Sequence, residues 1–193
     1  MTLGIDDAFI KEWEPRYDLT EHDEPNYQKL LCLVAQEMNS LGTISKETFK
    51  EIWKWKGAMR VFHRVRINEY DTRYAEAFRR AAFEPPERKL AALLAPGVKL
   101  PGVGAPTGST IMHFIHPKSM PIIDVRTVEV LFEAGLVSTK QRDLGHYEEF
   151  RKAIEGIRHR CPSWCLRQID RALFAYHKQV LDKKGQDQEC RSH

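Results

Sequence analysis

Apolar residues recur along this chain at intervals of three and four, which is the period of an amphipathic helix. Ser45 is suited to cap a helix that ends near Gly57. No run of alternating apolar and polar residues predicts a strand, so we expect an all-α protein. A first apolar stripe lies between Pro25 and the predicted stop at Gly42, and it consists of Tyr27, Leu30, Leu31, Val34, Met38 and Leu41.

The rest of the chain predicts further helices of the same kind. Asp71 is the expected cap of a third helix, and Pro85-Pro86 separates it from a short helix over 88–94. A helix over 106–115 carries Pro106 in its first turn, where a missing N–H does no harm. The last helices are expected to bury Val125, Val128, Leu131 and Phe132, then Tyr147, Phe150, Ile154 and Ile157, and, after a cap at Ser163, Trp164, Leu173, Tyr176 and Val180.

The most informative stretch is Leu100-Pro101-Gly102-Val103-Gly104, which leads into the helix over 106–115. Gly102 and Gly104 are predicted to let a tight turn pass through backbone conformations that a Cβ would obstruct. The first amides of the following helix lack internal partners, and such amides are natural phosphate ligands. Asp124 follows at the start of the next helix, so we expect its carboxylate to lie near this turn.

These residues resemble the helix-hairpin-helix (HhH-GPD) DNA glycosylase superfamily. Leu100 to Gly104 is similar to the family's hairpin, Thr107 and Gly108 to its small-residue helix start, and Asp124 to its catalytic aspartate. The resemblance covers roughly residues 86 to 134.

The resemblance implies one two-lobed helical unit over 1–193, with a DNA cleft between the lobes. One lobe would hold 25–123, including the hairpin at 98–115, and the other would combine 1–24 with 124–193.

The activity that the resemblance implies is hydrolysis of the N-glycosidic bond of a damaged or modified base, which leaves an abasic site in DNA. An ionised carboxylate suits this chemistry because it stabilises the cation-like sugar, and a helix start favours the ionised form of Asp124. Pro106 stands where lyase-competent members carry their Schiff-base lysine, so a monofunctional glycosylase is expected and a lyase is not. Arg126 replaces a usual histidine. Judged by its position alone, Asp124 is an ordinary N-cap.

Candidate base-pocket residues and DNA contacts lie on both sides of this motif. Trp55 and Lys56 combine a stacking surface with positive charge, as sites for flipped bases often do. Gln36 lies where relatives often place a gap-filling glutamine, and His113 lies beside the turn; an exposed helix position and ordinary packing are the alternatives for these two. The expected DNA contacts are Gly102, Val103, Gly104, Pro106, Thr107, Gly108, Ser109, Lys99, Lys118 and Arg126.

Charge is distributed unevenly along the chain. Residues 1–53 hold five Lys/Arg against 11 Asp/Glu, whereas residues 54–126 hold 13 against six. The basic block contains the hairpin, and its side chains, Lys89 among them, are candidates for tracking a phosphate backbone. Solvated helix faces are the alternative explanation.

Composition bounds the remaining possibilities. With 193 residues and 42% hydrophobic content, the chain can bury one core or two small lobes that share an interface. No stretch is long and apolar enough to span a membrane, and the N-terminal residues lack a basic region followed by an apolar run, so a cytoplasmic protein is expected. The cysteines are too scattered for a disulfide framework or an iron–sulfur cluster, so we expect no metal or cofactor: Cys32, Cys161, Cys165 and Cys190. No obligate protein partner is predicted.

The sequence leaves two other functions open. Hairpins of this kind also serve as non-specific DNA grips, so a catalytically inactive helix-hairpin-helix DNA-binding module is the main alternative. A helical scaffold that does not bind nucleic acid is the second. For an enzyme, the excised base would be alkylated, deaminated, oxidised or enzymatically hypermodified; the last would suit antiviral defence against phage DNA, and the others would suit DNA repair.

Overall fold

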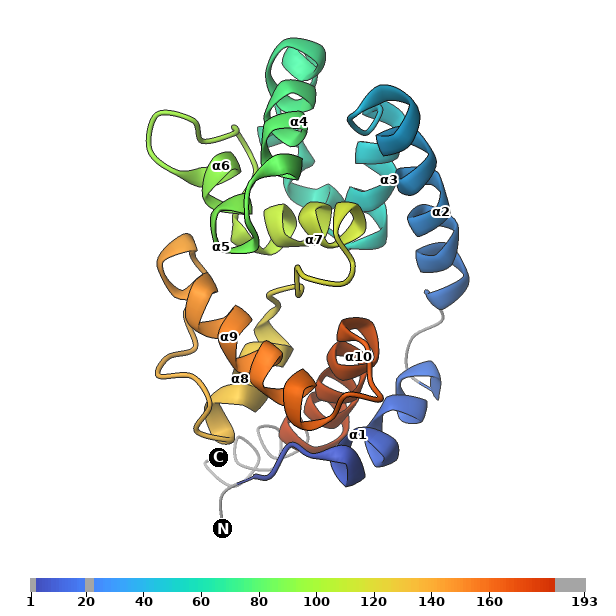
Figure 1. Ribbon diagram of the computed structural model, residues 1–193, viewed down its shortest axis with the longest axis vertical. Coiled ribbons are helices and arrows are strands. Elements are labelled where there is room, and N and C mark those ends of the chain that lie inside the picture. The colour runs from blue at the N-terminus through green and yellow to red at the C-terminus, as the bar shows by residue number, and fades with distance from the viewer. Residues whose placement is uncertain (1–2, 20–22, 183–193) are drawn as a thin grey trace, which may run out of the picture.

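The computed structural model describes residues 3–19 and 23–182, and over these residues the protein is helical and contains no strand (Figure 1). The all-α prediction is therefore confirmed for this part of the chain. The α-helices are α1 (Asp7–Trp13), α2 (Glu24–Leu41), α3 (Lys46–Trp55), α4 (Ala75–Phe83), α5 (Pro86–Lys89), α6 (Ala91–Leu94), α7 (Ala105–Ile115), α8 (Val125–Glu133), α9 (Leu144–Arg160) and α10 (Leu166–Tyr176). Short 3₁₀ segments are η1 (Glu14–Leu19), η2 (Met59–Arg64) and η3 (Ile67–Glu69), and single π-turns are η4 (Tyr70–Tyr74) and η5 (His177–Leu181).

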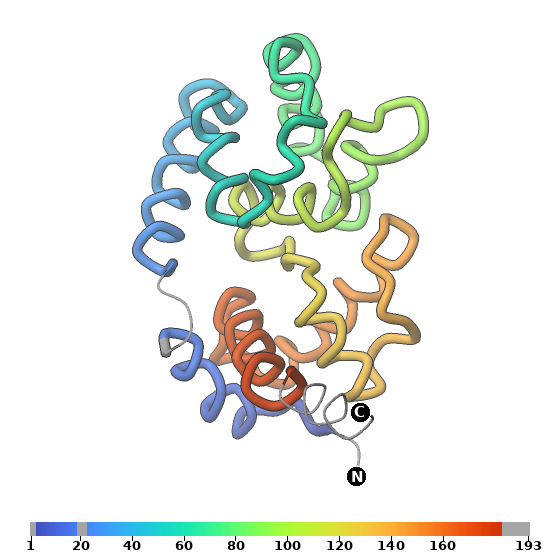
Figure 2. The backbone as a smooth tube through the Cα atoms, turned by 180° about the vertical axis from the view of Figure 1, so that it is seen from behind, coloured from blue at the N-terminus to red at the C-terminus, as the bar shows by residue number. Residues whose placement is uncertain are grey.

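The helices gather in two groups, as both views of the backbone show (Figures 1 and 2). In the first group α7 contacts α2, α3 and α6, α2 contacts α3, and α4 packs on α5 and α6. In the second, α10 contacts α1, η1, α8, α9 and η5. The segment 116–124 crosses from α7 in the first group to α8 in the second, so the start of α8 lies where the groups meet.

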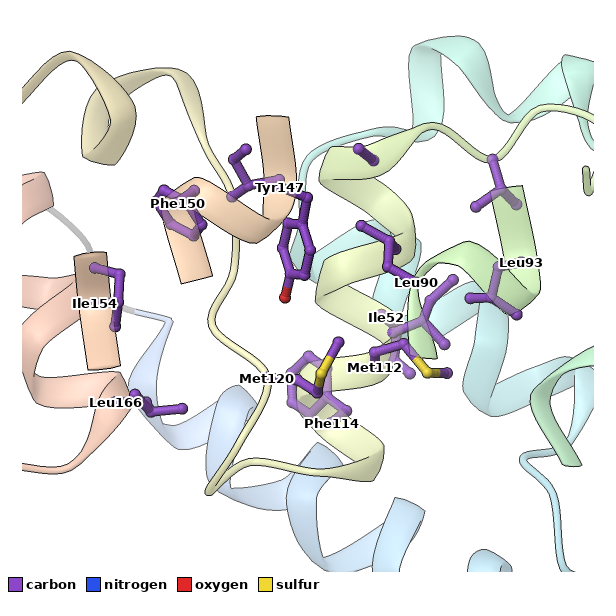
Figure 3. Packing of buried hydrophobic residues seen from close by; sticks show 14 of the residues in the cluster. Ile52, Leu90, Leu93, Met112, Phe114, Met120, Tyr147, Phe150, Ile154 and Leu166 are labelled. Carbon is purple, nitrogen blue, oxygen red and sulfur yellow. The ribbon is translucent and has the colours of Figure 1, made fainter. Parts of the chain in front are cut away.

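One hydrophobic core runs through both groups (Figure 3). Met112 and Phe114 of α7 belong to it on one side and Tyr147 and Phe150 of α9 on the other. The hydroxyl of Tyr147 also donates a hydrogen bond of 2.8 Å to the carbonyl of Pro121, which holds the crossing segment. The groups are therefore joined by packing as well as by the chain.

Two helix boundaries lie where the sequence predicts them. The Ser45 hydroxyl accepts a hydrogen bond of 3.2 Å from the amide of Thr48, so Ser45 caps α3 as predicted. Gly42 ends α2 with φ of +67°, a left-handed conformation that glycine adopts readily. The predicted stop of α2 and start of α3 are both confirmed.

Two predicted caps are wrong. Asp71 lies inside the π-turn η4, and α4 begins only at Ala75, because buried Tyr70 and Tyr74 on either side of Asp71 anchor this turn by donating hydrogen bonds to distant backbone carbonyls. Cys165, and not Ser163, precedes α10: its amide donates to the side chain of Gln168 at 3.0 Å.

Two residues predicted to face inward are instead exposed. Leu41 is 57% exposed and Phe132 is 39% exposed. Each lies in the last turn of its helix. No helix in the described residues is long and apolar enough to cross a membrane.

The loop between α6 and α7 contains the predicted glycine turn. Gly102 has φ of +78°, and a Cβ there would lie 2.7 Å from the backbone of Arg64 and Val65, so glycine is required on both counts. The same prediction for Gly104 is wrong, because its φ of −107° suits any residue and a Cβ would have no neighbour closer than 3.8 Å. Gly108 has a packing reason instead: a Cβ would lie 2.9 Å from Leu90.

Candidate active site

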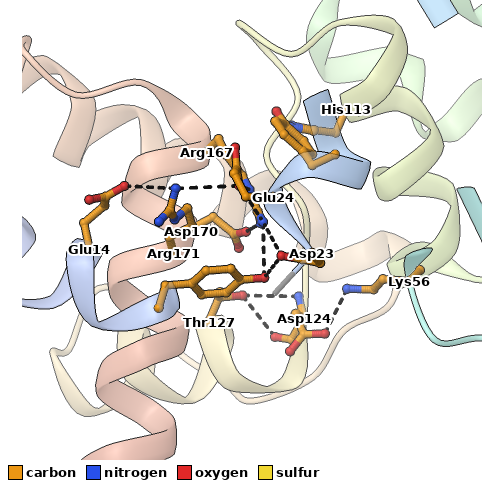
Figure 4. A network of polar contacts seen from close by, with 12 residues as sticks. Glu14, Asp23, Glu24, Lys56, His113, Asp124, Thr127, Arg167, Asp170 and Arg171 are labelled. Atoms are coloured by element: carbon orange, nitrogen blue, oxygen red, sulfur yellow. Dashed lines mark hydrogen bonds and ion pairs between the residues drawn. The ribbon is translucent and has the colours of Figure 1, made fainter. Parts of the chain in front are cut away.

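A cavity of about 250 Å³ lies where the two helix groups meet, beside the start of α8. Its volume is just below the roughly 300–1,000 Å³ of typical small-molecule pockets. The side chains around it are predominantly charged or aromatic, and Figure 4 labels Asp23, Lys56, Asp124, Arg167 and Asp170 among them. The lining residues are Tyr17, Asp23, Trp55, Lys56, Gly57, Ile122, Asp124, Arg126, Arg167, Asp170 and Phe174.

Asp124 is held in this cavity by contacts on both carboxylate oxygens. It caps α8, with Oδ1 accepting 3.0 Å from the amide of Arg126 and Oδ2 accepting 2.9 Å from Nζ of Lys56. The preceding residue is fixed too, because the amide of Ile123 donates to the buried hydroxyl of Ser109 on α7 at 3.1 Å. The Asp124 side chain keeps 19% of its surface exposed, so the carboxylate is restrained without being sealed from the cavity.

Asp124 is ionised at neutral pH. Burial raises the pKa of its carboxyl, but the neighbouring ammonium of Lys56, the hydrogen bond from Lys56 and the amide of Arg126 together lower that pKa below its usual value. The cavity therefore presents a fixed negative charge at the first turn of α8.

A buried arginine from α10 organises the other wall of the cavity. Arg167 donates to Asp170 Oδ2 at 2.9 Å and to the hydroxyl of Tyr17 at 3.1 Å, and it lies 3.3 Å from both Asp23 and Glu24. Its guanidinium also lies over the rings of three aromatic residues, at 4.9 Å from Tyr17, 4.7 Å from Tyr27 and 5.3 Å from Trp55. These contacts hold η1, α2 and α3 against α10.

Asp170 is a second carboxylate in the cavity, with properties opposite to those of Asp124. Burial raises its pKa most, and the charge of Asp124 adds to that effect, while Arg167 and Lys56 lower the pKa only in part. The net pKa of Asp170 is therefore above its usual value. Environments that separate the pKa values of two neighbouring carboxyls are typical of sites that handle protons.

Sequence reasoning missed most of this second wall. Arg167, Asp170 and Phe174 recur at intervals of three and four on α10, so they share one helix face with Arg171. Two arginines and an aspartate at that spacing would normally indicate a solvated face. Only the burial of both arginines distinguishes this face from a surface one.

Trp55 and Lys56, which were predicted as base-pocket residues, both line the cavity together with Arg126. The guanidinium of Arg126 lies 4.7 Å from the ring centre of Phe174, which also lines the cavity. The indole Nε1 of Trp55 is buried and has no hydrogen-bond partner among the described residues.

Two predicted pocket residues lie elsewhere. His113 is a wrong prediction: it is 1% exposed, its Nδ1–H donates to the carbonyl of Met120 at 2.7 Å, and its Nε2 accepts from the hydroxyl of Tyr27 at 2.8 Å. Burial lowers the pKa of His113 to about 4, so it is a neutral packing residue. Gln36 is exposed on α2 and does not line the cavity.

The hairpin residues divide into those that face the core and those with free amides. Val103, Gly108 and Ser109 are buried, so these three residues are not available for DNA contacts. The amide of Gly104 donates to Thr107 Oγ1 at 3.2 Å, and that of Gly108 donates to the Gly104 carbonyl at 2.8 Å. In the described part of the chain, the amides at 102, 105 and 107 have no acceptor. Pro106 lies beside a separate surface hollow that Lys140 and Arg142 also line.

The lysines predicted to bind phosphate also differ in exposure. Lys89 is a wrong candidate for phosphate binding, because it is 5% exposed and its ammonium donates to the carbonyls of Ala81 and Ala82 at 3.3 and 2.7 Å. Lys99 and Lys118 are exposed. The described residues contain no cluster of three or more His, Cys, Asp or Glu side chains placed to hold a metal ion, and Cys190 lies outside them.

Comparisons with protein-family models, with curated proteins and with solved structures found no match to this chain.

Proposed function

We propose that this chain is a monofunctional DNA N-glycosylase of the helix-hairpin-helix type. The two helix groups would be the lobes of that fold, and the Asp124 cavity would lie in the DNA cleft between them. The single observation that supports this most is an ionised, partly exposed carboxylate at the start of α8, tied through Ile123 and Ser109 to the helix that follows the glycine hairpin.

The chemistry follows from that carboxylate. Breaking the C1′–N bond of a nucleotide leaves positive charge on the sugar, and a fixed negative charge in a low-dielectric cavity stabilises it. Water then forms a bond to C1′, its proton passes to the carboxylate, and the base departs with the electrons of the broken bond. The products are a free base and an abasic site.

The hairpin supplies a place for the DNA backbone. The free amides at 102, 105 and 107 lie at or just before the N-terminus of α7, where the helix dipole favours a phosphate. Lys99 and Lys118 add exposed positive charge near the two ends of the same helix. Binding of this kind is independent of base sequence and weakens with salt.

The cavity is suited to an extruded base. The target bond is inaccessible in a duplex, so the nucleotide must be flipped out, and flipped bases are held by aromatic faces and polar edges. Tyr17, Trp55 and Phe174 supply the former, and Asp170 supplies a carboxylate. The enzyme would act in the cytoplasm, either in base repair or in removal of hypermodified bases from phage DNA.

The test is a set of duplexes that carry alkylated, deaminated, oxidised or hypermodified bases, each incubated with the protein and then treated with alkali to cut at abasic sites. With the duplex that is cut, Asp124→Asn is expected to slow base release by about 10²–10³-fold, the usual cost of removing a stabilising electrostatic group, and to leave DNA affinity unchanged.

Asp6→Asn is the matched control. Asp6 caps α1 through a 2.9 Å bond from the amide of Phe9, so it repeats the capping role of Asp124 away from the cavity, and its replacement should leave base release intact. If the protein binds every duplex and none shows Asp124-dependent base loss, it is an inactive helix-hairpin-helix DNA-binding module.

A further inference from the structure

Arg126 contributes a cation to the cavity that has no carboxylate partner. Lys56 is paired with Asp124 at 2.9 Å, and Arg167 is paired with Asp170 at the same distance. No ion pair or hydrogen bond joins the guanidinium of Arg126 to an acceptor among the described residues, and its Nε is buried. The positive charge at the first turn of α8 is therefore open to a ligand.

The guanidinium is nevertheless held in place. It lies 4.7 Å from the ring centre of Phe174, and that ring packs against Tyr17 with the two ring centres 5.4 Å apart. A guanidinium over an aromatic face keeps the N–H groups along its edge available for hydrogen bonds. Buried donors without a partner are rare in proteins, so a fixed donor of this kind indicates a place where a ligand supplies the acceptor.

Cleavage of a glycosidic bond generates such an acceptor. In the proposed reaction the base departs with the electrons of the C1′–N bond, and in a uracil-type pyrimidine this negative charge spreads from N1 onto the conjugated carbonyl oxygens. Donors placed where charge develops stabilise the transition state more than the ground state. We propose that Arg126 donates hydrogen bonds to a carbonyl oxygen of an extruded uracil-type base and stabilises that base as it leaves. This role rests on the proposed function, which brings the base into the cavity.

Charges and protons balance at the two ends of the broken bond. Asp124 stabilises the cationic sugar and takes a proton from the attacking water, whereas Arg126 stabilises the anionic base and keeps its own proton, as guanidinium groups do in proteins. The released anion then takes up the proton that Asp124 holds. An alkylated purine that is already cationic leaves as a neutral base and gains nothing from Arg126. The substrates indicated are therefore neutral bases with a carbonyl group conjugated to the glycosidic nitrogen.

The first experiment measures single-turnover release of uracil and of 5-fluorouracil from duplexes, with the full chain in saturating excess. Fluorine stabilises the departing anion, so 5-fluorouracil needs less help from the protein. Arg126→Gln is expected to slow release of uracil by about 10²–10³-fold, as the loss of an oxyanion donor does, and to slow release of 5-fluorouracil less. Arg126→Lys keeps the charge without the planar fork and should recover part of the lost rate.

This dependence on the leaving group separates the proposed role from two others. If Arg126 binds a phosphate, its loss weakens affinity for both duplexes and leaves both rates unchanged at saturation. If Arg126 acts only by lowering the pKa of Asp124, both rates fall by the same factor. Arg16→Gln is the matched control, because the Arg16 guanidinium lies 4.3 Å from the ring centre of Trp13, outside the cavity, and its loss should change neither rate.

A second experiment does not depend on base release. Equilibrium dialysis measures binding of free 5-nitrouracil, which is an anion at neutral pH, and of free uracil, which is neutral. Wild-type protein should bind the anion more tightly than uracil, and Arg126→Gln should lose that preference. Thermal unfolding checks that the variants are folded.

The role of Arg126 is refuted if wild-type protein binds 5-nitrouracil no better than uracil, if Arg126→Gln leaves release of uracil unchanged or slows both bases by the same factor, or if only bases of another class are released. Base release together with any of these results removes only the role of Arg126. Arg126-dependent binding of the anion without release of any base removes only the glycosylase.

Discussion

The hairpin and the cavity wall formed by α10 are built on different principles. The hairpin depends on close packing around small residues: Gly102 passes within contact distance of the Arg64 backbone, and Gly108 lets Leu90 pack against α7. The α10 wall depends on paired charges instead: the Arg167 guanidinium is surrounded by carboxylates and aromatic rings from segments far apart in sequence. A local motif is sensitive to added volume, whereas an assembled polar wall is sensitive to lost charge.

Removing Arg167 should destabilise the protein more than any single change at the hairpin. Arg167→Met leaves Asp23, Glu24 and Asp170 without their shared cation, and breaking a buried pair from one side costs about 3–5 kcal/mol. We expect the free energy of unfolding, measured in urea, to fall by that amount.

Arg79→Met is the control for this change, because Arg79 pairs with Glu76 on the exposed face of α4. A surface pair contributes about 0–1 kcal/mol, so little should be lost. Equal losses in the two variants would mean that the stability of the α10 wall does not depend on its buried charge.

The contrast also explains how much was predictable from sequence. Helices, the αL stop at Gly42, the cap at Ser45 and the turn at Gly102 depend on neighbours in the chain, and each is found in the structure. The α10 wall depends on several segments meeting, and a pattern within α10 does not reveal that Arg167 is buried. Trp55 and Lys56 were found because aromatic and basic residues alternate there.

The same reasoning explains the errors. His113 and Lys89 carry groups that suit a binding site, but the fold satisfies those groups internally, His113 with Tyr27 and Met120, and Lys89 with backbone carbonyls. The sequence shows which side chain can form a hydrogen bond, but it does not show which group in the fold will be its partner. The amine of Lys56 illustrates the reverse case, since a residue 68 positions before Asp124 meets it only in the folded chain.

Two separate glycine substitutions in the hairpin give the next largest difference in the free energy of unfolding. Gly102→Ala places a side chain at a positive φ and against backbone that cannot move aside; the strained conformation alone costs about 1–3 kcal/mol, and the clash adds to it. Gly104→Ala meets neither obstacle, and a compatible Gly→Ala change stabilises by about 0.4–1 kcal/mol. Urea unfolding of the two variants measures the difference.

The same two variants also test whether the DNA backbone lies on the hairpin. Gly104 is exposed directly before α7, so a phosphate at the free amides of 105 and 107 would approach it closely. Gly104→Ala should therefore weaken DNA binding without weakening the fold. If affinity is unchanged, the backbone of DNA does not lie on this turn; if Gly102→Ala is as stable as wild type, shape does not govern the hairpin.

Near neutral pH the titration of His113 has the smallest effect of these changes on the free energy of unfolding, and it tests the packing between α2 and α7. Its hydrogen bonds join α2, α7 and the segment 116–121. Because burial lowers its pKa from 6.5 to about 4, the unfolded chain binds a proton between these pH values and the folded chain does not. Stability should thus fall as the pH drops from about 6.5 towards 4, by about 1.4 kcal/mol for each pH unit from this residue.

His113→Gln removes the titrating group while keeping polar atoms at the site, so this variant should lose that part of the pH slope even if it is less stable at pH 7. The measurement is the free energy of unfolding in urea at several pH values for both proteins. The carboxylates of the chain contribute the same slope to both, so the difference reports His113 alone. Parallel curves for the two proteins would mean that His113 binds a proton as readily in the fold as in the unfolded chain, and the neutral hydrogen-bonded link between α2 and α7 would have to be abandoned.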